Sequence, residues 1–341
     1  MAKAVKLADI AARVGVSTVT VSKALSNQKG VSEDMRTKIK LLADELGYVP
    51  LSETKRSREN KSYNIGVVVS ARFFNQSQSF YWLMYQELAK KAPSRNCFTM
   101  LEVVSEEDEN AEILPRILKG ARIDGLVVIG MMKTGYLKQI EINSKVPVVY
   151  MDFYDKETGK DAVVSNNYFG MYKLTDHLCK LGHTQIAYVG TLFTTDSITD
   201  RYFGYCKALK ENNIDLRYDY VIDDRFRENG SKEGFKYSLP SPLPTAFVCN
   251  CDITASEIIN EVKKQGLRVP EDVSVVGYDD YVFPSLGETR ITTYSVDMKE
   301  MASRTLKIMN AKLAGDNTEK GISIVEGKMI LGDTSGPVRR K

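Results

Sequence analysis

The chain begins with apolar residues at helical spacing. Leu7, Ile10, Ala11 and Val14 fall on one stripe, which predicts an amphipathic helix at this end of the chain. Gly15 follows directly. Because glycine tolerates the left-handed conformation of a tight turn, we expect the helix to end there.

A second helix is predicted immediately after this turn. Ser17 or Thr18 can cap its first turn, and Val21 returns an apolar side chain to the junction near the small Ala11. This spacing directs the second helix outward, as a helix-turn-helix requires to enter a DNA major groove. A helical hairpin inside a protein core is the alternative, which the short, polar, lysine-bearing outer face disfavours.

A third helix is expected after Val31. Ser32 is its predicted N-cap, acidic residues occupy its first turn, and Gly47 ends it shortly before Pro50. Its apolar face consists of Ile39, Leu42 and Leu46.

From Tyr63 onward, short apolar runs alternate with amphipathic segments. The runs predict strands at 65–69, 99–104, 125–129, 146–150, 185–189, 246–249 and 273–276. Helices are expected at 80–92, 109–119, 168–181, 201–212 and 254–265. Nearly continuous apolar strands are typical of parallel sheets covered on both faces. Because the alternation runs twice, we expect two α/β lobes with a ligand site between them, beyond the carboxyl ends of the strands.

Charge is unevenly distributed along the 341 residues. Residues 1–62 contain 12 Lys/Arg and 7 Asp/Glu, whereas the remainder contains 35 and 37. A small basic module on a near-neutral body is typical of a head that binds DNA phosphates. Residues 51–62 are polar with nothing to bury, which predicts a linker.

Several function classes are disfavoured by what the sequence lacks. It has no apolar signal segment and no apolar run approaching about 20 residues, so we expect a cytoplasmic protein without a membrane partner. The five cysteines are expected to be reduced thiols. Cys249 and Cys251 form a lone C-x-C, and neither His177 nor His183 groups with it, so no metal or cofactor is predicted. Without a dinucleotide, P-loop or nucleophile-elbow motif, an enzyme is not expected.

The motifs are specific in combination. Leu7-Ala8-Asp9-Ile10-Ala11, Val16-Ser17 with Thr20-Val21-Ser22, and Leu46-Gly47-Tyr48-x-Pro50 resemble the headpiece of the lactose-repressor/galactose-repressor (LacI/GalR) family of bacterial transcription factors. Segments 163–183, 269–280 and 291–293 are similar to the crossovers of that family's effector domain, which resembles periplasmic sugar-binding proteins. The resemblance covers essentially the whole chain.

The resemblance implies a domain organisation. A helix-turn-helix domain would occupy 1–50, a hinge 51–62, and a two-lobed effector and dimerisation domain with parallel sheets 63–337. Lobe 1 would comprise about 64–163 and 294–322. Lobe 2 would comprise about 164–291 and 323–337.

The resemblance also implies the DNA contacts. Thr18, Val19 and Lys23 would reach base edges. The family's hinge helix normally carries an alanine and a wedging leucine, but here those positions are Thr54 and Ser57, which cannot unstack a base step. The full set of expected DNA-binding residues is Ser17, Thr18, Val19, Thr20, Ser22, Lys23, Asn27, Ser32, Lys55, Arg56 and Arg58.

A sugar-like effector needs carboxylates, a forked donor and an aromatic plate. By local motif, Asp152, the two-pronged donor Arg201, Asp252 and Ser197 match effector positions of the family, and Phe226 matches a stacking position. Cys251 stands where the family usually has asparagine, which removes an amide. The residues expected around the effector are Arg72, Phe73, Ser79, Tyr81, Asp152, Ser197, Arg201, Phe226 and Asp252.

Each assignment has a structural alternative. Asp152 can cap a turn, and Arg201 and Asp252 can form an internal ion pair or helix-start contacts. The aromatic residues near 73–81 can belong to the core, and the acids of Tyr278-Asp279-Asp280 are expected to be strand-end structure rather than a catalytic pair.

These observations together predict a sequence-specific DNA-binding repressor of carbohydrate-utilisation genes, controlled by a sugar or sugar derivative. A sugar-binding transport receptor and a purine-responsive regulator of the same family are the alternatives. Reading a palindromic operator requires two heads, so we expect a homodimer. A further strand is predicted at Met329-Ile330-Leu331, and a tetramer is not expected, because the chain ends within ten residues of it.

Overall fold

The computed structural model describes residues 5–48, 62–73, 79–120, 122–157, 159–227, 230–232, 234–281, 289–316, 318–319 and 321–339. The chain divides into two compact units, Met1–Ser62 and Tyr63–Lys341. In the described part of the chain, no helix is both long enough and apolar enough to span a bilayer.

The N-terminal unit contains three helices, α1 (Leu7–Val14), α2 (Thr18–Leu25) and α3 (Glu33–Glu45). Gly15 adopts a left-handed conformation (φ 75°) and ends α1 as predicted. Ser17 caps α2, its Oγ accepting the backbone N–H of Thr20. Ser32 occupies the N-cap position of α3, but its side chain makes no capping hydrogen bond.

A small core holds these helices together. Its fully buried members alternate branched and small side chains, so the helices approach one another closely. They are Ile10, Ala11, Val21, Ala24, Ile39 and Ala43. The predicted Leu42 and Leu46 pack against this core from partly buried positions.

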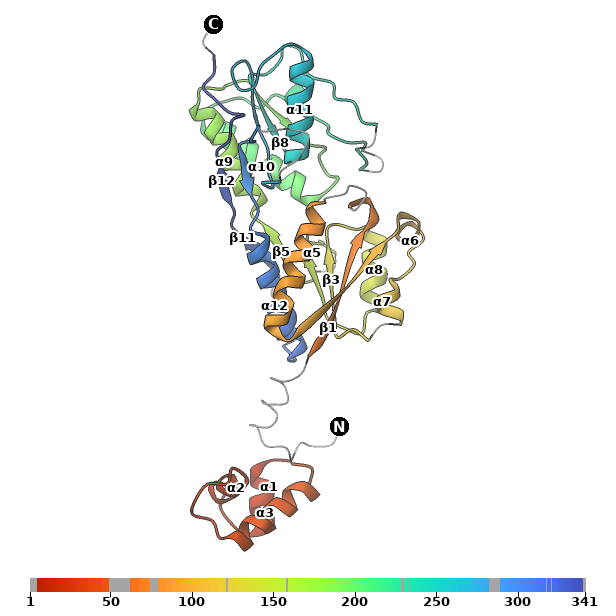
Figure 1. Ribbon diagram of the computed structural model, residues 1–341, viewed down its shortest axis with the longest axis vertical. Helices are drawn as coiled ribbons and strands as arrows, with labels where there is room; N and C mark the ends of the chain where they lie inside the picture. Colours follow the sequence, from red (N-terminus) through yellow and green to blue (C-terminus); the bar gives the residue numbers. More distant parts are fainter. Residues whose placement is uncertain are drawn as a thin grey trace. The chain divides into compact units, whose positions relative to one another are not determined.

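The C-terminal unit begins with the sheet of lobe 1 (Figure 1). Its strand order is β11-β5-β4-β3-β1-β2, and every pairing is parallel. The strands are β1 (Tyr63–Ser70), β2 (Cys97–Val104), β3 (Gly125–Ile129), β4 (Val148–Met151), β5 (Ala162–Ser165) and β11 (Ile322–Val325). The predicted parallel sheet is therefore present, with β1, β3, β4 and β5 mostly buried and β2 and β11 as partly exposed edges.

Helices cover both faces of this sheet. One face carries α5 (Phe80–Lys91) and α12 (Met298–Leu313), and the other carries α6 (Glu106–Asn110), α7 (Arg116–Lys119) and α8 (Thr134–Asn143) (Figure 1). The single helix predicted at 109–119 is wrong. Pro115 begins a new short helix there, because proline interrupts the backbone hydrogen bonds of a helix interior.

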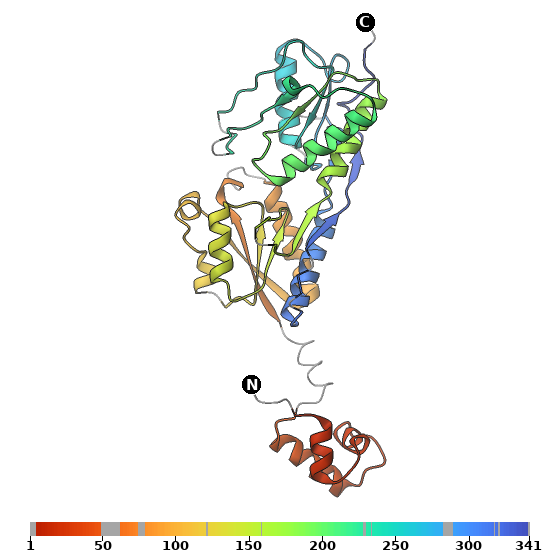
Figure 2. The same ribbon diagram turned by 180° about the vertical axis from the view of Figure 1, so that it is seen from behind.

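Lobe 2 has a four-stranded parallel sheet of order β7-β6-β8-β9. Its strands are β6 (Ile186–Val189), β7 (Val221–Ile222), β8 (Ala246–Cys249) and β9 (Ser274–Val276). Helices α9 (Asn167–Lys180) and α10 (Asp196–Glu211) lie on one face and α11 (Asp252–Lys264) on the other (Figure 2). Short 3-10 turns at Ala71–Phe73, Ala92–Arg95 and Tyr218–Tyr220 complete the unit.

Three segments join the lobes, after β5, after β9 and after β11. Two of these crossings are tied by tyrosine. The Tyr278 hydroxyl lies 3.0 Å from Ser165 Oγ and donates to the Asn166 carbonyl, while the backbone N–H of Gly327 donates to Tyr294 Oη. Strands β10 (Thr293–Ser295) and β12 (Lys328–Ile330) pair antiparallel beside them.

The lobe boundary expected at 322/323 cuts through one strand. All four residues of β11 pair in parallel with β5, so lobe 1 extends to Val325. The chain then returns to lobe 2, where Val275 donates its backbone N–H to the Thr334 carbonyl and His183 Nε2 lies 3.0 Å from the Gly336 carbonyl. His183 is thus a buried residue fixed by the C-terminal segment.

Candidate functional site

The first candidate surface is the outer face of α2. Val19 is 60% exposed, and Thr18, Ser22 and Lys23 are exposed beside it. A helix of eight residues that buries only Val21 and Ala24 leaves the rest of its surface free. An exposed apolar side chain next to hydroxyls and a lysine suits contact with thymine methyls and base edges.

The other expected DNA-binding residues have different local roles. Ser17 and Thr20 are joined by the N-cap hydrogen bond and by a 2.9 Å contact between their hydroxyls. Asn27 adopts a left-handed conformation and accepts from Lys40 Nζ at 2.8 Å, which fixes the end of α2 against α3. Ser32 is exposed. The linker residues Lys55, Arg56 and Arg58, with Thr54 and Ser57, lie outside the described residues.

The second candidate site lies between the lobes and is built around Arg201. This side chain projects from the first half of α10 and is buried. Its Nε donates to Asn167 Oδ1 at 2.8 Å, its Nη1 donates to the Asn250 carbonyl at 2.5 Å, and its Nη2 lies 3.3 Å from Asp279 Oδ1. The guanidinium stacks on the ring of Tyr278, 3.8 Å from its centroid.

Arg201 therefore differs from the expected ligand-facing fork. All three nitrogens are engaged within lobe 2, and the ion pair is with Asp279 rather than with the Asp252 considered in the alternative. Arg201 holds the carboxylate of Asp279 in place. Asp279 follows β9 and has a backbone φ of 108°. Such a conformation is rare outside glycine and is found preferentially at functional sites.

Asp152 approaches the same region from lobe 1. It follows β4, adopts a left-handed conformation (φ 69°) and is 6% exposed. Burial raises the pKa of Asp152 to about 6, against the opposing effects of Arg201 and of a hydrogen bond with Tyr81. Burial also raises the pKa of Asp279 to about 7, where attraction to Arg201 opposes it and repulsion by Asp152 adds to it.

These two carboxylates share an unusual feature. Among the described residues, Oδ1 of Asp152 and Oδ1 of Asp279 are buried without a hydrogen-bond partner. Buried polar atoms in folded proteins are nearly always hydrogen-bonded. The site therefore presents, from each lobe, a carboxylate oxygen without a hydrogen bond, and that of Asp279 keeps its 3.3 Å ion pair with Arg201.

Aromatic rings form the remainder of the lobe 1 wall. Phe73 and Tyr81 pack with ring centroids 4.5 Å apart, and Tyr81 interacts electrostatically with Asp279 and Arg201 of lobe 2. Arg72 is directed elsewhere, since it pairs with the buried Glu109 and donates to the Met131 carbonyl.

Ser79 and Ser197, expected beside the effector, have local partners. Ser79 Oγ caps α5 by accepting the Trp82 N–H at 3.0 Å. Ser197 Oγ lies 3.0 Å from the hydroxyl of Thr195, the N-cap of α10. Both serines thus contribute first of all to helix starts.

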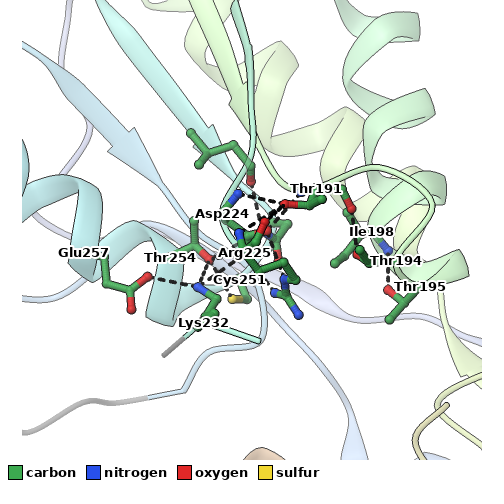
Figure 3. Close-up of polar contacts among 12 residues, drawn as sticks. Thr191, Thr194, Thr195, Ile198, Asp224, Arg225, Lys232, Cys251, Thr254 and Glu257 are labelled. Carbon is green, nitrogen blue, oxygen red and sulfur yellow. Dashed lines mark hydrogen bonds and ion pairs between the residues drawn. The ribbon is translucent and has the colours of Figure 1, made fainter. Parts of the chain in front are cut away.

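Lobe 2 contains a dense polar network beside this site (Figure 3). Arg225 binds Asp224 through two nitrogens, at 3.0 and 2.8 Å, and Lys232 lies 3.3 Å from the same carboxylate. Asp224 is fully buried and also accepts from the side chains of Asn250 and Thr254. Despite burial, attraction to Arg225 and Lys232 lowers the pKa of Asp224 below its usual range.

The same network continues toward α11 (Figure 3). Lys232 Nζ donates to Thr254 Oγ1 at 2.6 Å and to Glu257 Oε2 at 2.9 Å, and Cys251 Sγ lies 3.2 Å from Thr254 Oγ1. Each charge in this network has a fixed partner of opposite sign. Among the described residues, no cluster of three or more His, Cys, Asp or Glu is arranged to hold a metal.

Asp252 and Phe226 lie at the margin of the site. Asp252 accepts the Tyr281 N–H at 2.8 Å, and its Oδ1 would collide with a Cβ on Gly277, so it packs against the chain leaving β9. Phe226 is 40% exposed and packs edge-on against Phe235.

Two further contacts connect the lobes near Arg201. The Tyr154 hydroxyl lies 3.2 Å from Asp200 Oδ2, and Lys156 Nζ lies 3.0 Å from Asp196 Oδ1. Both residues of lobe 1 follow β4, and both acids are on α10. One loop of lobe 1 is thus bound to the same helix that carries Arg201.

Comparison with known proteins identifies both units. Residues 6–51 match the model "Bacterial regulatory proteins, lacI family", and residues 175–335 match the model "Periplasmic binding protein-like domain". Among curated relatives, the HTH-type transcriptional repressor PurR of Aliivibrio salmonicida is 27% identical over 317 residues, covering 92% of this chain and 94% of the relative. PurR of Vibrio campbellii is 25% identical and covers 96% and 97%.

Solved structures share the fold. A complex of the transcriptional regulator CelR with cellobiose superposes with a TM-score of 0.68 at 23% identity, covering 97% of this chain and all of that chain. A LacI transcriptional regulator from a Rhodococcus species gives 0.65 at 24% identity, covering 81% and 99%. The chain thus combines a helix-turn-helix head of the lacI family of bacterial regulatory proteins with a periplasmic-binding-protein-like body, and its curated relatives are transcriptional repressors.

Proposed function

We propose that this repressor binds a palindromic operator as a homodimer and is controlled by a small effector that binds between its lobes. The observation that carries the effector site is the pair of unsatisfied carboxylate oxygens of Asp152 and Asp279, which come from opposite lobes. A ligand that donates hydrogen bonds to both oxygens stabilises one arrangement of the lobes over another, and this differential affinity is the origin of regulation.

A sugar or sugar derivative is the effector that we propose. Hydroxyls supply the donors that Asp152 and Asp279 need, and the Phe73–Tyr81 pair offers an apolar plate for a ring face. Two structural neighbours bound to cellobiose and to ribose support this choice. A purine is the second candidate, because aromatic rings beside acceptors also suit a flat base with N–H groups.

Dimerisation is proposed through the free edge of lobe 1. Strand β2 is an edge of the sheet, and it exposes Phe98 (60%), Met100 (37%) and Val103 (42%) beside Trp82 and Leu83 of α5. Several large apolar side chains on one edge favour a protein interface over solvent. Sedimentation should therefore give a dimer, and Phe98→Lys should shift it toward monomer. A tetramer would contradict the proposal.

The DNA-binding half of the proposal is tested by selection. Bound sequences recovered from a randomised duplex pool should contain a palindrome, and Lys23→Ala should weaken binding by about 1–3 kcal/mol and relax one position of each half-site. An equal loss of affinity on all sequences would mean that Lys23 contacts only the DNA phosphates.

Deleting residues 1–62 separates a repressor from a transport receptor, because only a repressor loses its output. Action on DNA also assigns the protein to the cytoplasm.

The effector half is tested by a thermal-shift screen of sugars, sugar phosphates and purines. A ligand that binds only the folded state raises the melting temperature by mass action. The ligand found should then change operator affinity in the wild type.

A further inference from the structure

The donors of the interlobe site are already in use. Arg201 directs Nε to Asn167, Nη1 to the Asn250 carbonyl and Nη2 toward Asp279, and one face of its guanidinium rests on Tyr278. Each nitrogen therefore has a protein partner, and one face of the guanidinium is covered. A carboxylate or phosphate of a ligand would have to share Arg201 with these partners.

The neighbouring cations are also matched. Arg225 is bound by two nitrogens to Asp224, and Lys232 lies between Asp224 and Glu257. These two cations and two acids balance in charge. The remaining groups are one cation, Arg201, and three acids, Asp152, Asp252 and Asp279, so carboxylates are in excess at the site.

The excess coincides with the unsatisfied atoms. Oδ1 of Asp152, of Asp252 and of Asp279 is buried without a hydrogen bond, although Asp279 Oδ1 keeps its ion pair with Arg201, and Asp152 and Asp279 both have left-handed backbone conformations. Burying an anion without a compensating cation is unfavourable, and removing an opposite partner from a buried pair is strongly so. A ligand that brings a positive charge corrects both deficits.

We propose that the effector is a hydroxylated molecule that carries a primary ammonium group, an amino sugar or amino polyol, and that its ammonium is held between Asp152 and Asp279. This inference rests on the proposed effector site and specifies its ligand class. An ammonium supplies three N–H donors and one positive charge. Hydroxyls on the same molecule can then face the Phe73–Tyr81 wall and the remaining polar groups.

The titration behaviour of the site agrees with this ligand. Burial raises the pKa of both carboxyls, and repulsion by Asp152 adds to the rise at Asp279, so the unliganded site gains from taking up positive charge. Tyr81, Arg201, Arg225 and Asp252 are the other titratable groups that act on these carboxyls, and Arg225 is neutralised by Asp224.

Matched ligand pairs test the proposal on the full chain. Thermal shift and calorimetry at pH 7 compare glucosamine, galactosamine, mannosamine and 1-amino-1-deoxysorbitol with glucose, galactose, mannose and sorbitol. N-acetylglucosamine and gluconate serve as the neutral-amide and anionic members. We expect the best amine to bind roughly tenfold or more tightly than its neutral partner, since hydrogen bonds to charged groups contribute more than neutral ones.

Two variants locate the ammonium. Asp152→Asn and Asp279→Asn keep the side-chain shape and remove one charge each, and each should weaken the best amine by roughly tenfold. Asp223→Asn is the matched control, because Asp223 is a lobe 2 acid paired with the exposed Arg227. Melting curves without ligand establish that each variant folds.

Three results overturn the proposal: a neutral or anionic member as the best ligand of the panel, no amine that binds better than its neutral partner, or amine binding unchanged in both variants. Operator selection distinguishes this failure from that of the proposed function. If the protein binds a palindrome and responds to a neutral sugar or a purine, the proposed function holds and the ammonium proposal is wrong. If the protein binds no operator, the proposed function is wrong, and the ligand pairs still test the ammonium proposal.

Discussion

The two lobes contribute unlike halves to the interlobe site. In lobe 2, Arg201 has partners on all its nitrogens, and the carboxylate of Asp224 is held by two cations and two neutral side chains. In lobe 1, the half-site consists of an aromatic pair and Asp152, which keeps an unsatisfied oxygen. The lobe 2 half is largely preorganised by ion pairs, although Asp279 also keeps an oxygen without a hydrogen bond, and the lobe 1 half is the less complete of the two.

This difference indicates how a ligand can be sensed. A preorganised half loses little freedom when it binds, so it sets affinity and orientation. The incomplete half gains its missing partner only when ligand is present, so it supplies the differential interaction that shifts the lobes. Changes in lobe 2 should therefore alter stability first, whereas changes in lobe 1 should alter the response.

The largest expected effect comes from Arg201→Ala. The change leaves Asn167, the Asn250 carbonyl and the buried Asp279 without their donor, and breaking a buried pair in this way costs about 3–5 kcal/mol. Chemical denaturation should show this loss without ligand, and the effector response should vanish. The sequence-based expectation of a ligand-facing fork implies instead a stable variant that lacks only the response.

Arg227→Ala is the matched control for that prediction. Arg227 is a 60% exposed arginine of the same lobe, paired with Asp223, and its removal should change stability by less than about 1 kcal/mol. If Arg201→Ala is as stable as this control, the lobe 2 half is not the preorganised frame described above.

The second effect tests the helix pair that carries Arg201. A Cβ on Gly204 of α10 would lie 2.0 Å from the Tyr168 carbonyl oxygen of α9, so Gly204→Ala must separate the two helices. We expect a loss of about 3 kcal/mol, at the upper end for overpacking, because the obstacle is backbone. Gly120→Ala, which meets only one atom at 3.9 Å, should be nearly neutral in the same thermal measurement. Equal melting temperatures would contradict close packing here.

Sequence pattern predicted the parts of this molecule that local chemistry determines. Gly15 ends α1 and Ser17 caps α2, because turn and cap preferences act over a few residues. The buried strands β1 and β3 appear where continuous apolar runs predicted them. The helix expected at 109–119 failed because Pro115 was not given its usual effect on a helix interior.

The interlobe site was harder to predict because its partners are distant in sequence. Asp279 lies 78 positions from Arg201, and the pattern around it suggested only strand-end structure. Its position directly beyond β9 was a usable signal, since ligand sites follow the carboxyl ends of parallel strands. Arg72 shows the opposite case, a residue expected at the effector because it follows β1. Its partner Glu109 comes from α6, and this ion pair directs Arg72 away from the expected effector site.

The third prediction concerns the lobe 1 half and its pH dependence. The pKa of Asp152 is raised to about 6 in the folded chain, above the ordinary value of 3.8, so the folded state binds more protons than the unfolded state between these values. Stability attributable to this group is thus present below pH 4 and is lost as the pH rises through 6. Asp152→Asn removes this loss.

The measurement is the free energy of unfolding of wild type and Asp152→Asn from pH 4 to 7. The variant should gain on the wild type as the pH rises, by on the order of 2 kcal/mol at pH 7, since one pKa unit corresponds to about 1.4 kcal/mol. The same variant should respond weakly to effector. A constant difference in the free energy of unfolding across the pH range would contradict a raised pKa of Asp152 in the folded state.

The smallest effect should come from the contacts that join the halves. Tyr154→Phe removes the hydroxyl that meets Asp200, a half-buried group on the helix that carries Arg201, and a single hydrogen bond contributes about 0.5–1.5 kcal/mol. The closed arrangement of the lobes should weaken by that amount, which calorimetry would register as a few-fold rise in effector Kd with little change in melting temperature. Lys156→Ala offers the matched comparison, because Lys156 is 75% exposed and its ion pair with Asp196 is screened by water. If both variants bind effector as the wild type does, the loop after β4 takes no part in closure, and coupling between the halves runs through Asp152 alone. If only Tyr154→Phe weakens binding, the loop and the carboxylate act together, and the incomplete lobe 1 half is sensed along the whole segment that follows β4.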